Sequence, residues 1–296
     1  MSRVLLTGAA GMLGLRVAET LLIKKIPILA MVLRKPESGF PSSHGIDFVE
    51  ADITKPKTLA KAFEGVDSVI HCAGLIDGSG KDVFFRVNAE GTKNLVRAAE
   101  KAGVKKFVHI SSADVAFRKG AYSLSKLAGE SVVRASKLNW VVVRPAAIYD
   151  LKKSKLTRVI LMAKRLPVVP VLGSGDKKLQ PVHVDDVADV IVKALCSPKA
   201  VGKVYTLASE KPVSMNEIIA LAAKALGKRV LKLHIPMPIL FAAAALNEKV
   251  SKRPFLNRDQ LALLSKDKPA DASLAVKELG FSPKPIEKGI KEILGN

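Results

Sequence analysis

The first half of the chain alternates short apolar runs with longer segments in which apolar residues recur at helical spacing. The short runs are almost uninterrupted, as strands that are covered on both faces of a sheet must be. They predict strands at residues 4–7, 28–33, 47–50, 68–71, 106–110 and 140–143. The segments between them predict helices at residues 13–24, 57–64, 83–102 and 122–137. This alternation is typical of βαβ units, so we expect an α/β protein built on a doubly wound parallel sheet.

Beyond Tyr149 the pattern loosens, which indicates the start of a smaller second lobe. A strand and a helix return over residues 182–195, and residues 203–207 predict one more strand of the main sheet. From Ser209 onward helical patterns dominate. The expected domains are the sheet domain at residues 1–150, with 181–207 returning to it, and a mostly helical lobe at residues 151–180 and 208–296.

Local signals also mark helices in this second lobe. Ser214 precedes a periodic segment and Glu217 follows three residues later, the spacing of a capping box, while Gly227 is placed to end the helix. The apolar stretch at residues 235–246 contains two prolines and is flanked by charges. It is shorter than the roughly 18 uninterrupted apolar residues of a membrane span, so we expect a buried helix there and no membrane segment.

Composition adds a strong positive charge to this picture. The chain has 48 Lys and Arg residues against 27 Asp and Glu residues, a formal net charge of +21. Such a field attracts anions, but the basic residues are scattered in twos and threes and only 5% of residues are aromatic. We therefore expect a solvated basic surface rather than a nucleic-acid interface.

The cysteines and the first residues bear on the cellular compartment. Cys72 and Cys196 are far apart and have no metal-ligand spacing, so they indicate neither a disulfide framework nor a zinc site. The first predicted strand begins at Val4, which leaves no room for a signal peptide. The expected location is the cytoplasm.

A glycine-rich segment joins the first predicted strand to the first predicted helix. Its glycines, Gly8, Gly11 and Gly14, are spaced three residues apart. Glycines in such a turn let the backbone bend, approach a pyrophosphate and pack a helix on a strand, while free amides at the helix start face the anion. In this strand–turn–helix context the segment predicts a dinucleotide-binding site.

The glycine spacing, with Thr7 in front of it, resembles the short-chain dehydrogenase/reductase superfamily. The chain is also similar to the extended branch of that superfamily, the NAD-dependent epimerase/dehydratase family. The segments that carry this similarity are Asp52-Ile53-Thr54, His71-Cys72-Ala73-Gly74, Val87-Asn88-Ala89-Glu90-Gly91-Thr92, Ser111-Ser112, Tyr122-Ser123-Leu124-Ser125-Lys126 and Arg144-Pro145. The resemblance implies a Rossmann fold, an NAD(P) cofactor and an oxidoreductase or epimerase activity.

The resemblance also implies the cofactor contacts. Asp52 would accept a hydrogen bond from the adenine amino group, and Ala73 and Gly74 would let the cofactor lie close to the backbone. The expected cofactor-binding residues are Gly8, Gly11, Met12, Leu13, Gly14, Arg34, Lys35, Asp52, Ile53, Ala73, Gly74, Ser111, Tyr122, Lys126, Pro145 and Ile148.

The end of the second predicted strand indicates which dinucleotide binds. An acidic residue about 20 positions beyond the last glycine of the turn is typical of NAD binding. That position is held by Arg34, followed by Lys35. Because a cation attracts the additional phosphate of NADP and a carboxylate repels it, we expect NADP(H) as the cofactor, with NADPH preferred over NADH.

The expected catalytic residues lie on and before the fourth predicted helix. Tyr122 and Lys126 are four residues apart, so both project from one face of that helix. A tyrosine has an ordinary pKa of about 10, and a nearby ammonium group favours its phenolate form. The resemblance implies that Tyr122 exchanges the substrate hydroxyl proton, that Lys126 holds the ribose hydroxyls, and that Ser112 hydrogen-bonds the reacting oxygen.

Two segments depart from the sugar-nucleotide epimerases of this family. The stretch from Ser112 to Tyr122 is short, and Val115-Ala116-Phe117 stands where Val-Tyr-Gly is typical. Two other residues have both a functional and a structural interpretation. Asn88 is either an active-site residue or a residue that orders its helix, and His183 lies either beside the substrate cleft or in the core.

The function expected from these observations is NADP(H)-dependent hydride transfer at a hydroxyl or carbonyl carbon. The substrate would be a sugar nucleotide or a small ketone or alcohol. The alternative is a noncatalytic NADPH-binding regulatory or assembly protein. Relatives often pair through the helices that correspond to residues 83–102 and 122–137, so a homodimer is expected.

Overall fold

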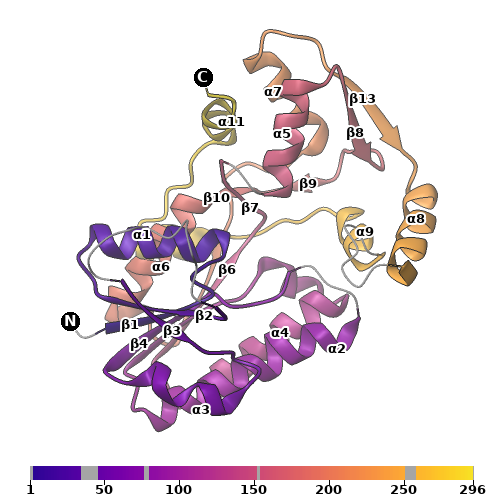
Figure 1. Ribbon diagram of the computed structural model, residues 1–296. Coiled ribbons are helices and arrows are strands. Elements are labelled where there is room, and N and C mark those ends of the chain that lie inside the picture. The colour runs from indigo at the N-terminus through magenta and orange to yellow at the C-terminus, as the bar shows by residue number, and fades with distance from the viewer. Residues whose placement is uncertain (1–2, 35–45, 77–79, 152–153, 251–257, 296) are drawn as a thin grey trace.

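A seven-stranded parallel sheet forms the centre of the molecule, in the order β11-β6-β5-β4-β1-β2-β3. The computed structural model describes residues 3–34, 46–76, 80–151, 154–250 and 258–295. The sheet consists of β1 (Arg3–Thr7), β2 (Ile28–Val32), β3 (Ile46–Glu50), β4 (Val66–His71), β5 (Lys106–Ile110), β6 (Trp140–Pro145) and β11 (Val204–Leu207). The chain winds from β1 to β3 on one side and from β4 to β6 on the other (Figure 1). This topology confirms the predicted doubly wound parallel sheet.

Helices cover both faces of the sheet (Figure 1). They are α1 (Met12–Ile23) and α6 (Val184–Cys196) on one face, and α3 (Thr92–Lys101) and α4 (Ala121–Arg134) on the other. Leu21 and Ile191 belong to the core beneath the first pair, and Leu95 and Val133 to the core beneath the second. Because apolar side chains are buried on both faces, β2 is buried at every position.

The chain returns to the sheet after an excursion through the second lobe. Strand β11 pairs in parallel with β6, and α10 (Ser273–Leu279) packs against it. The ring of Tyr205 is fully buried, and its hydroxyl donates to Glu278 of α10 at 2.6 Å. Lys203 donates to the other oxygen of the same carboxylate at 2.6 Å.

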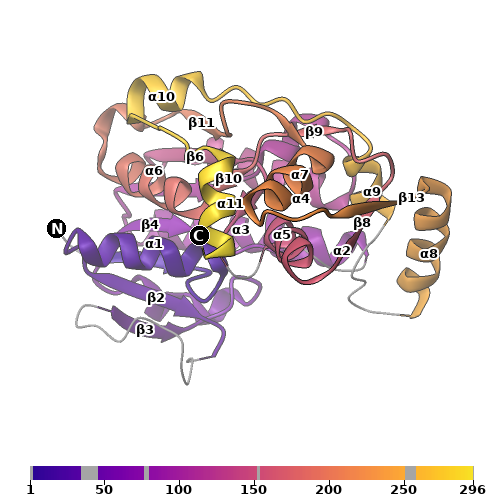
Figure 2. The same cartoon turned by 90° about the horizontal axis from the view of Figure 1, so that it is seen from above.

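The second lobe has its own core, with Ile160, Ile218 and Ile290 at its centre. Three helices supply them: α5 (Lys155–Arg165), α7 (Met215–Ala225) and α11 (Ile286–Leu294). The paired strands of this lobe and its boundary are β7 (Ile148–Tyr149) with β10 (Val182–His183), β9 (Lys178–Leu179) with β12 (Val213–Ser214), and β8 (Val168–Leu172) with β13 (Leu231–Ile235). Helices α8 (Met237–Val250) and α9 (Arg258–Leu264) follow β13 (Figure 2).

The capping signals of α7 are confirmed. Ser214 accepts a hydrogen bond from the backbone amide of Glu217, and the Glu217 carboxylate accepts one from the amide of Ser214. Gly227 follows the helix with a φ of +63°. A glycine adopts this left-handed conformation without the strain that a Cβ causes.

The prediction of an α-helix at residues 57–64 is wrong. The segment forms two short 3₁₀ helices, Pro56–Thr58 and Ala60–Phe63. Leu59 and Ala62 are buried three residues apart, a spacing that the 3.0-residue turn of a 3₁₀ helix satisfies better than an α-helix does.

The helix predicted at residues 83–102 is not a continuous α-helix, because a π-helical segment interrupts it. It consists of α2 (Lys81–Phe84), a π-helix at Phe85–Gly91 and then α3. A π-helical turn carries one additional residue and is frequent at functional sites.

The buried helix predicted at residues 235–246 is half correct. A helix forms there as α8, but Ile239 and Leu246 are 59% and 65% exposed. Apolar content alone therefore predicted the helix correctly and its environment incorrectly. Within the described residues, no helix combines the length and apolarity that crossing a membrane requires.

Candidate active site

The glycine segment turns β1 directly into α1 beside β4. Gly8 has a φ of +67°, and a Cβ on it would lie 2.6 Å from the amide nitrogen of Ala73. A Cβ on Gly14 would lie 2.1 Å from the carbonyl oxygen of Gly8. Gly11 caps α1 without a side-chain hydrogen bond. The backbone amides at the helix start, which lack intrahelical acceptors, are those of Met12, Leu13 and Gly14.

This turn fits the pyrophosphate of a dinucleotide. Side chains at Gly8 or Gly14 would collide with backbone, so only glycine permits the close approach of β1, α1 and β4. The turn also lies between β1 and β4, where the winding of the sheet changes direction. Ligands of open parallel sheets bind at this point, beyond the carboxyl ends of the strands.

A buried histidine ties the glycine turn to the π-helix. The hydroxyl of Thr92 donates to the carbonyl oxygen of Asn88 at 2.7 Å, so it accepts from Nε2 of His71 at 3.0 Å. Nδ1 of His71 is then the acceptor for the hydroxyl of Thr7 at 2.7 Å, and Thr7 in turn accepts from the amide of Ala73. The geometry thus requires the neutral ring. Burial lowers the pKa of His71 to about 3.

This histidine predicts a loss of stability in acid. Its pKa is about 6.5 in the unfolded chain, so the unfolded state binds more protons as the pH falls from 6.5 toward 3. We expect the free energy of unfolding, measured with urea, to be about 2 kcal/mol lower at pH 5 than at pH 7 from His71 alone. His71→Asn should shrink this difference, and His234→Gln, at an exposed histidine, should not. An undiminished difference in His71→Asn would contradict the assignment.

Lys126 and Tyr122 lie one turn apart on α4, as their spacing predicts. The Lys126 side chain is buried and its Nζ donates to the carbonyl oxygen of Ile110, at the end of β5, at 2.6 Å. Burial lowers the pKa of this ammonium to about 8. Tyr122 is half-buried, with its ring edge-to-face against Phe84 at a centroid distance of 6.2 Å.

Asn88 of the π-helix orders the backbone beside this pair. Its Oδ1 accepts from the amide of Leu75 at 2.7 Å, and its Nδ2 donates to the Leu75 carbonyl and to Oγ of Ser125, both at 3.0 Å. A Cβ on Gly74 would lie 3.2 Å from Oδ1 of Asn88 and 3.5 Å from Nζ of Lys126. Asn88, Gly74 and Lys126 therefore meet at one point, beyond the end of β4.

The two serines after β5 have different partners. Ser111 donates to Glu130 at 2.8 Å, and this fully buried carboxylate also accepts two hydrogen bonds from the guanidinium of Arg144. Ser112 accepts from the amide of Asp114 at 3.2 Å, as the N-cap of a 3₁₀ helix at Ala113–Phe117. The Ser112 hydroxyl can still donate its proton to a ligand oxygen.

The other expected cofactor residues surround the same edge of the sheet. The register pairs Thr7 with Met31, so Arg34 lies three residues beyond the partner of Thr7, and it is exposed. Asp52 accepts from the amide and hydroxyl of Thr54, both at 2.8 Å. Ile53 and Pro145 are buried, and Ile148 belongs to β7. Lys35 lies outside the described residues.

A small cavity of about 20 Å³ lies between the sheet domain and the second lobe. The residues that line it are Ala113, Asp114, Phe117, Ala146, Ala147, Leu179, Gln180, Lys268, Pro269 and Ala270. Asp114 and Lys268 are the charged members of this lining, and they form an ion pair of 2.9 Å that joins the two sides. Ser112 directly precedes this lining, so the cavity lies next to the loop that follows β5.

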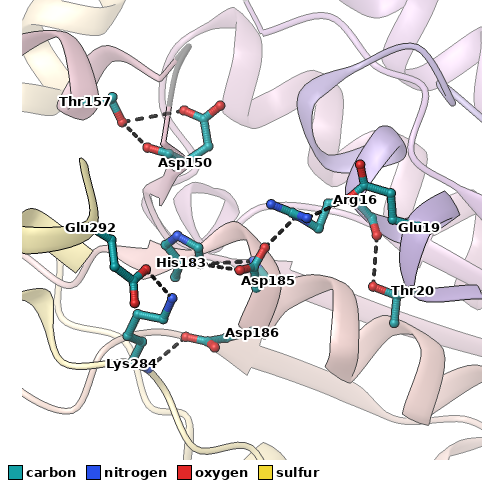
Figure 3. A network of polar contacts seen from close by, with 10 residues as sticks. All are labelled: Arg16, Glu19, Thr20, Asp150, Thr157, His183, Asp185, Asp186, Lys284 and Glu292. Atoms are coloured by element: carbon teal, nitrogen blue, oxygen red, sulfur yellow. Dashed lines mark hydrogen bonds and ion pairs between the residues drawn. The ribbon is translucent and has the colours of Figure 1, made fainter. Parts of the chain in front are cut away.

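His183 lies in a separate polar network, shown in Figure 3. Its ring is fully buried against Tyr149, and Nδ1 accepts from the amide of Asp185 at 3.3 Å. Asp185 forms an ion pair of 2.6 Å with Arg16 of α1, which connects α6 to α1. Of the two interpretations of His183, this position supports the core residue.

Sequence reasoning did not find Glu130 or the hydrogen bonds of His71. Glu130 lies on α4 while its partners follow β5 and lie on β6. Ser111 and Arg144 are 19 and 14 residues away from it along the chain, so no short motif marks the cluster.

Comparisons with known proteins agree with this geometry. A ceramide reductase of Caulobacter vibrioides is 32% identical over 247 residues, covering 82% of this chain and 76% of the relative. A 2-alkyl-3-oxoalkanoate reductase of Shewanella oneidensis is 24% identical, covering 99% of this chain and 85% of the relative. The structure of a UDP-glucuronic acid 4-epimerase from Bacillus cereus, in complex with UDP-glucuronic acid and NAD, has the same fold, with a TM-score of 0.78 at 21% identity over 98% of this chain and 96% of the other.

These relatives carry names of reductases and an epimerase, so the alternative of a noncatalytic protein is not favoured. The resemblance to the extended branch of the short-chain dehydrogenases and reductases is confirmed at the level of the family. Since the model of the NAD dependent epimerase/dehydratase family matches residues 4–208, the greater part of the sequence, the chain belongs to that family.

Proposed function

We propose that this enzyme is an NADP(H)-dependent oxidoreductase that interconverts a ketone and a secondary alcohol. The observation that carries the proposal is the position of Lys126, whose buried amino group lies beside Gly74 and Asn88, one helical turn from Tyr122. A buried lysine next to a tyrosine, beyond the strand ends that hold a dinucleotide turn, is suited to acid–base work at a carbon bearing oxygen.

Each of these residues has a part in the proposed reaction. The bound dinucleotide would supply or accept the hydride. Tyr122 would give its phenolic proton to the carbonyl oxygen in reduction and take it back in oxidation. The Lys126 ammonium would lower the pKa of Tyr122 and hold ribose hydroxyls, while Ser112 would donate a hydrogen bond to the reacting oxygen.

The cofactor preference is proposed from Arg34. A guanidinium at the end of β2 can form charge-assisted hydrogen bonds with the additional phosphate of NADP, whereas the ribose hydroxyl of NAD favours an acidic residue there. Arg34 is exposed, which leaves its side chain accessible to a nucleotide in solution.

A charge reversal tests this preference. Arg34→Asp should weaken NADPH binding, measured by calorimetric titration, by about 2–3 kcal/mol, or roughly 100-fold, and should affect NADH binding much less. Arg165→Asp reverses the charge of an exposed arginine on the second lobe and should leave both affinities unchanged. Equal losses for NADPH and NADH would contradict a role for Arg34 in phosphate recognition.

The lining of the small cavity between the lobes favours an uncharged, apolar substrate over a sugar nucleotide. Most of its residues are apolar, and its described cation, Lys268, is neutralised by Asp114. A diphosphate needs cations or open amides, while a ketone with an aliphatic tail needs apolar surface. The names of two relatives, a ceramide reductase and a 2-alkyl-3-oxoalkanoate reductase, support substrates that carry alkyl chains.

The test is a comparison of substrates with the purified protein. NADPH consumption should be measured with 3-oxo esters of increasing alkyl length, and UDP-glucose should be tested for conversion to UDP-galactose. Turnover of the esters that improves with chain length would support the proposal. Epimerisation of UDP-glucose without ester reduction would replace it by the sugar-nucleotide alternative.

A further inference from the structure

Strands β8 and β13 and helix α8 lie on the side of the molecule opposite the N-terminus (Figures 1 and 2), and they carry exposed apolar side chains. Strands β8 and β13 pair in parallel, and residues that pair across such strands share one face of the sheet. The pairs on the face away from the lobe core are Val168 with Leu231, Pro170 with Leu233, and Leu172 with Ile235. Leu231 and Leu233 are 67% and 58% exposed, although parallel strands are normally covered on both faces.

Helix α8 carries a second exposed apolar stripe. It begins at Met237, one residue after Pro236, so it directly continues β13. Five exposed apolar residues recur at i, i+3, i+4, i+7 and i+11 and therefore lie along one face: Ile239, Ala242, Ala243, Leu246 and Val250. The opposite face packs on Leu261 of α9 through Leu240 and Ala244. We call the outer face of β8 and β13, together with this stripe, the apolar rim.

Four basic residues border the apolar rim at one end. Lys164 and Arg165 precede β8, and Lys228 and Arg229 precede β13. Because the strands are parallel, both pairs lie at the same end. Nζ of Lys228 donates to the carbonyl oxygen of Lys164 at 2.8 Å, and Nζ of Lys164 donates to that of Leu294 at 2.7 Å, whereas Arg165 and Arg229 are exposed. Among the described residues, no carboxylate lies within ion-pair distance of any of the four.

We propose that the apolar rim docks on an anionic membrane surface, with its leucines and the α8 stripe against acyl chains and the exposed Arg165 and Arg229 against lipid phosphates. Exposed apolar residues bordered by Lys and Arg that no carboxylate neutralises are the combination that binds a protein in the plane of an anionic bilayer. The contact is peripheral.

Charge argues against a second copy of the chain as the occupant of the rim. Two copies facing each other through this surface would bring eight uncompensated cations together, on chains that each carry a net charge of +21. Lipid phosphates are anionic, so they attract the same cations that would repel each other in such a dimer, and this attraction adds to the affinity. The proposed reaction does not use this surface. The membrane proposal is therefore independent of the identity of the substrate.

Vesicle co-sedimentation of the full chain tests the proposal. The protein should bind vesicles of phosphatidylglycerol and not those of phosphatidylcholine, and high salt should weaken the binding by screening. Arg165→Gln/Arg229→Gln should weaken it about 30-fold, the equivalent of about 1 kcal/mol per cation. Leu231→Ser/Leu233→Ser should weaken it about tenfold or more through lost apolar burial.

Matched controls carry the same chemical changes elsewhere on the surface. Lys24→Gln/Lys61→Gln removes two exposed cations from the sheet domain, and Ile23→Ser removes an apolar residue that is 81% exposed. Both should bind vesicles like the unchanged protein, and thermal unfolding establishes that every variant is folded. Three outcomes would each overturn the proposal: no binding to phosphatidylglycerol, equal losses in rim and control variants, or a solution dimer that Leu231→Ser/Leu233→Ser dissociates.

Discussion

Replacing Tyr122 by phenylalanine should abolish most turnover and spare cofactor binding. The change removes one oxygen from a half-buried ring that packs edge-to-face on Phe84 and leaves Lys126 in place. Positioned proton transfer contributes about 10²- to 10⁴-fold, so we expect kcat/KM to fall by that factor with a 3-oxo ester and NADPH. Calorimetric titration should show nearly unchanged affinity for NADPH.

Tyr149→Phe is the matched control for this change. Its hydroxyl is fully buried and has no hydrogen-bond partner among the described residues, so its removal costs no bond and should leave turnover intact. If Tyr122→Phe retained more than a tenth of the activity, the general acid would have to be another group.

Replacing Glu130 by alanine should destabilise the fold more than any other single change considered. The fully buried carboxylate accepts from Nε and one Nη of the Arg144 guanidinium and from Ser111. Removing one partner of a buried ion pair leaves the other uncompensated, and typically costs about 3–5 kcal/mol. We expect a loss of that size in the free energy of unfolding, measured with urea.

Two further variants serve as a control and as a case of intermediate effect. Glu90→Ala removes an exposed carboxylate and should change the free energy of unfolding by less than about 0.5 kcal/mol. Glu130→Gln keeps an acceptor for Ser111 and should fall between the two. A loss below about 1 kcal/mol in Glu130→Ala would show that water or a rearranged side chain replaces the carboxylate.

The main sheet and the glycine turn could be predicted because both are encoded locally. Strand β2 was expected at residues 28–33 and forms at Ile28–Val32, since five consecutive buried positions leave a continuous apolar run. The turn at Gly8 needs a positive φ and a close approach to Ala73, requirements that only glycine meets. The spacing of Tyr122 and Lys126 fixed their common face once α4 formed.

The remaining features depend on contacts that local patterns do not contain. His71 contacts Thr7 and Thr92 only after β1, β4 and the start of α3 have assembled, so its neutral state has no local signature in the sequence. Apolar content predicted the helix at α8, but the same content fits a core and an exposed surface equally well. The 3₁₀ turns at Pro56–Thr58 and Ala60–Phe63 differ from an α-helix by a small change in winding that single residues do not determine.

The return of the chain to the main sheet through β11 limits where this protein can be truncated and how its second lobe can be exchanged with that of a relative. Strand β11 completes the sheet beside β6, and Glu278 of α10 accepts hydrogen bonds from Tyr205 and Lys203. The segment from β11 to α10 therefore stabilises the same sheet that carries the glycine turn. A truncation after residue 150 would leave β6 as a bare edge, open to pairing with another chain. A gene fusion that exchanges the second lobe between relatives therefore has to keep β11 and α10 together with the sheet.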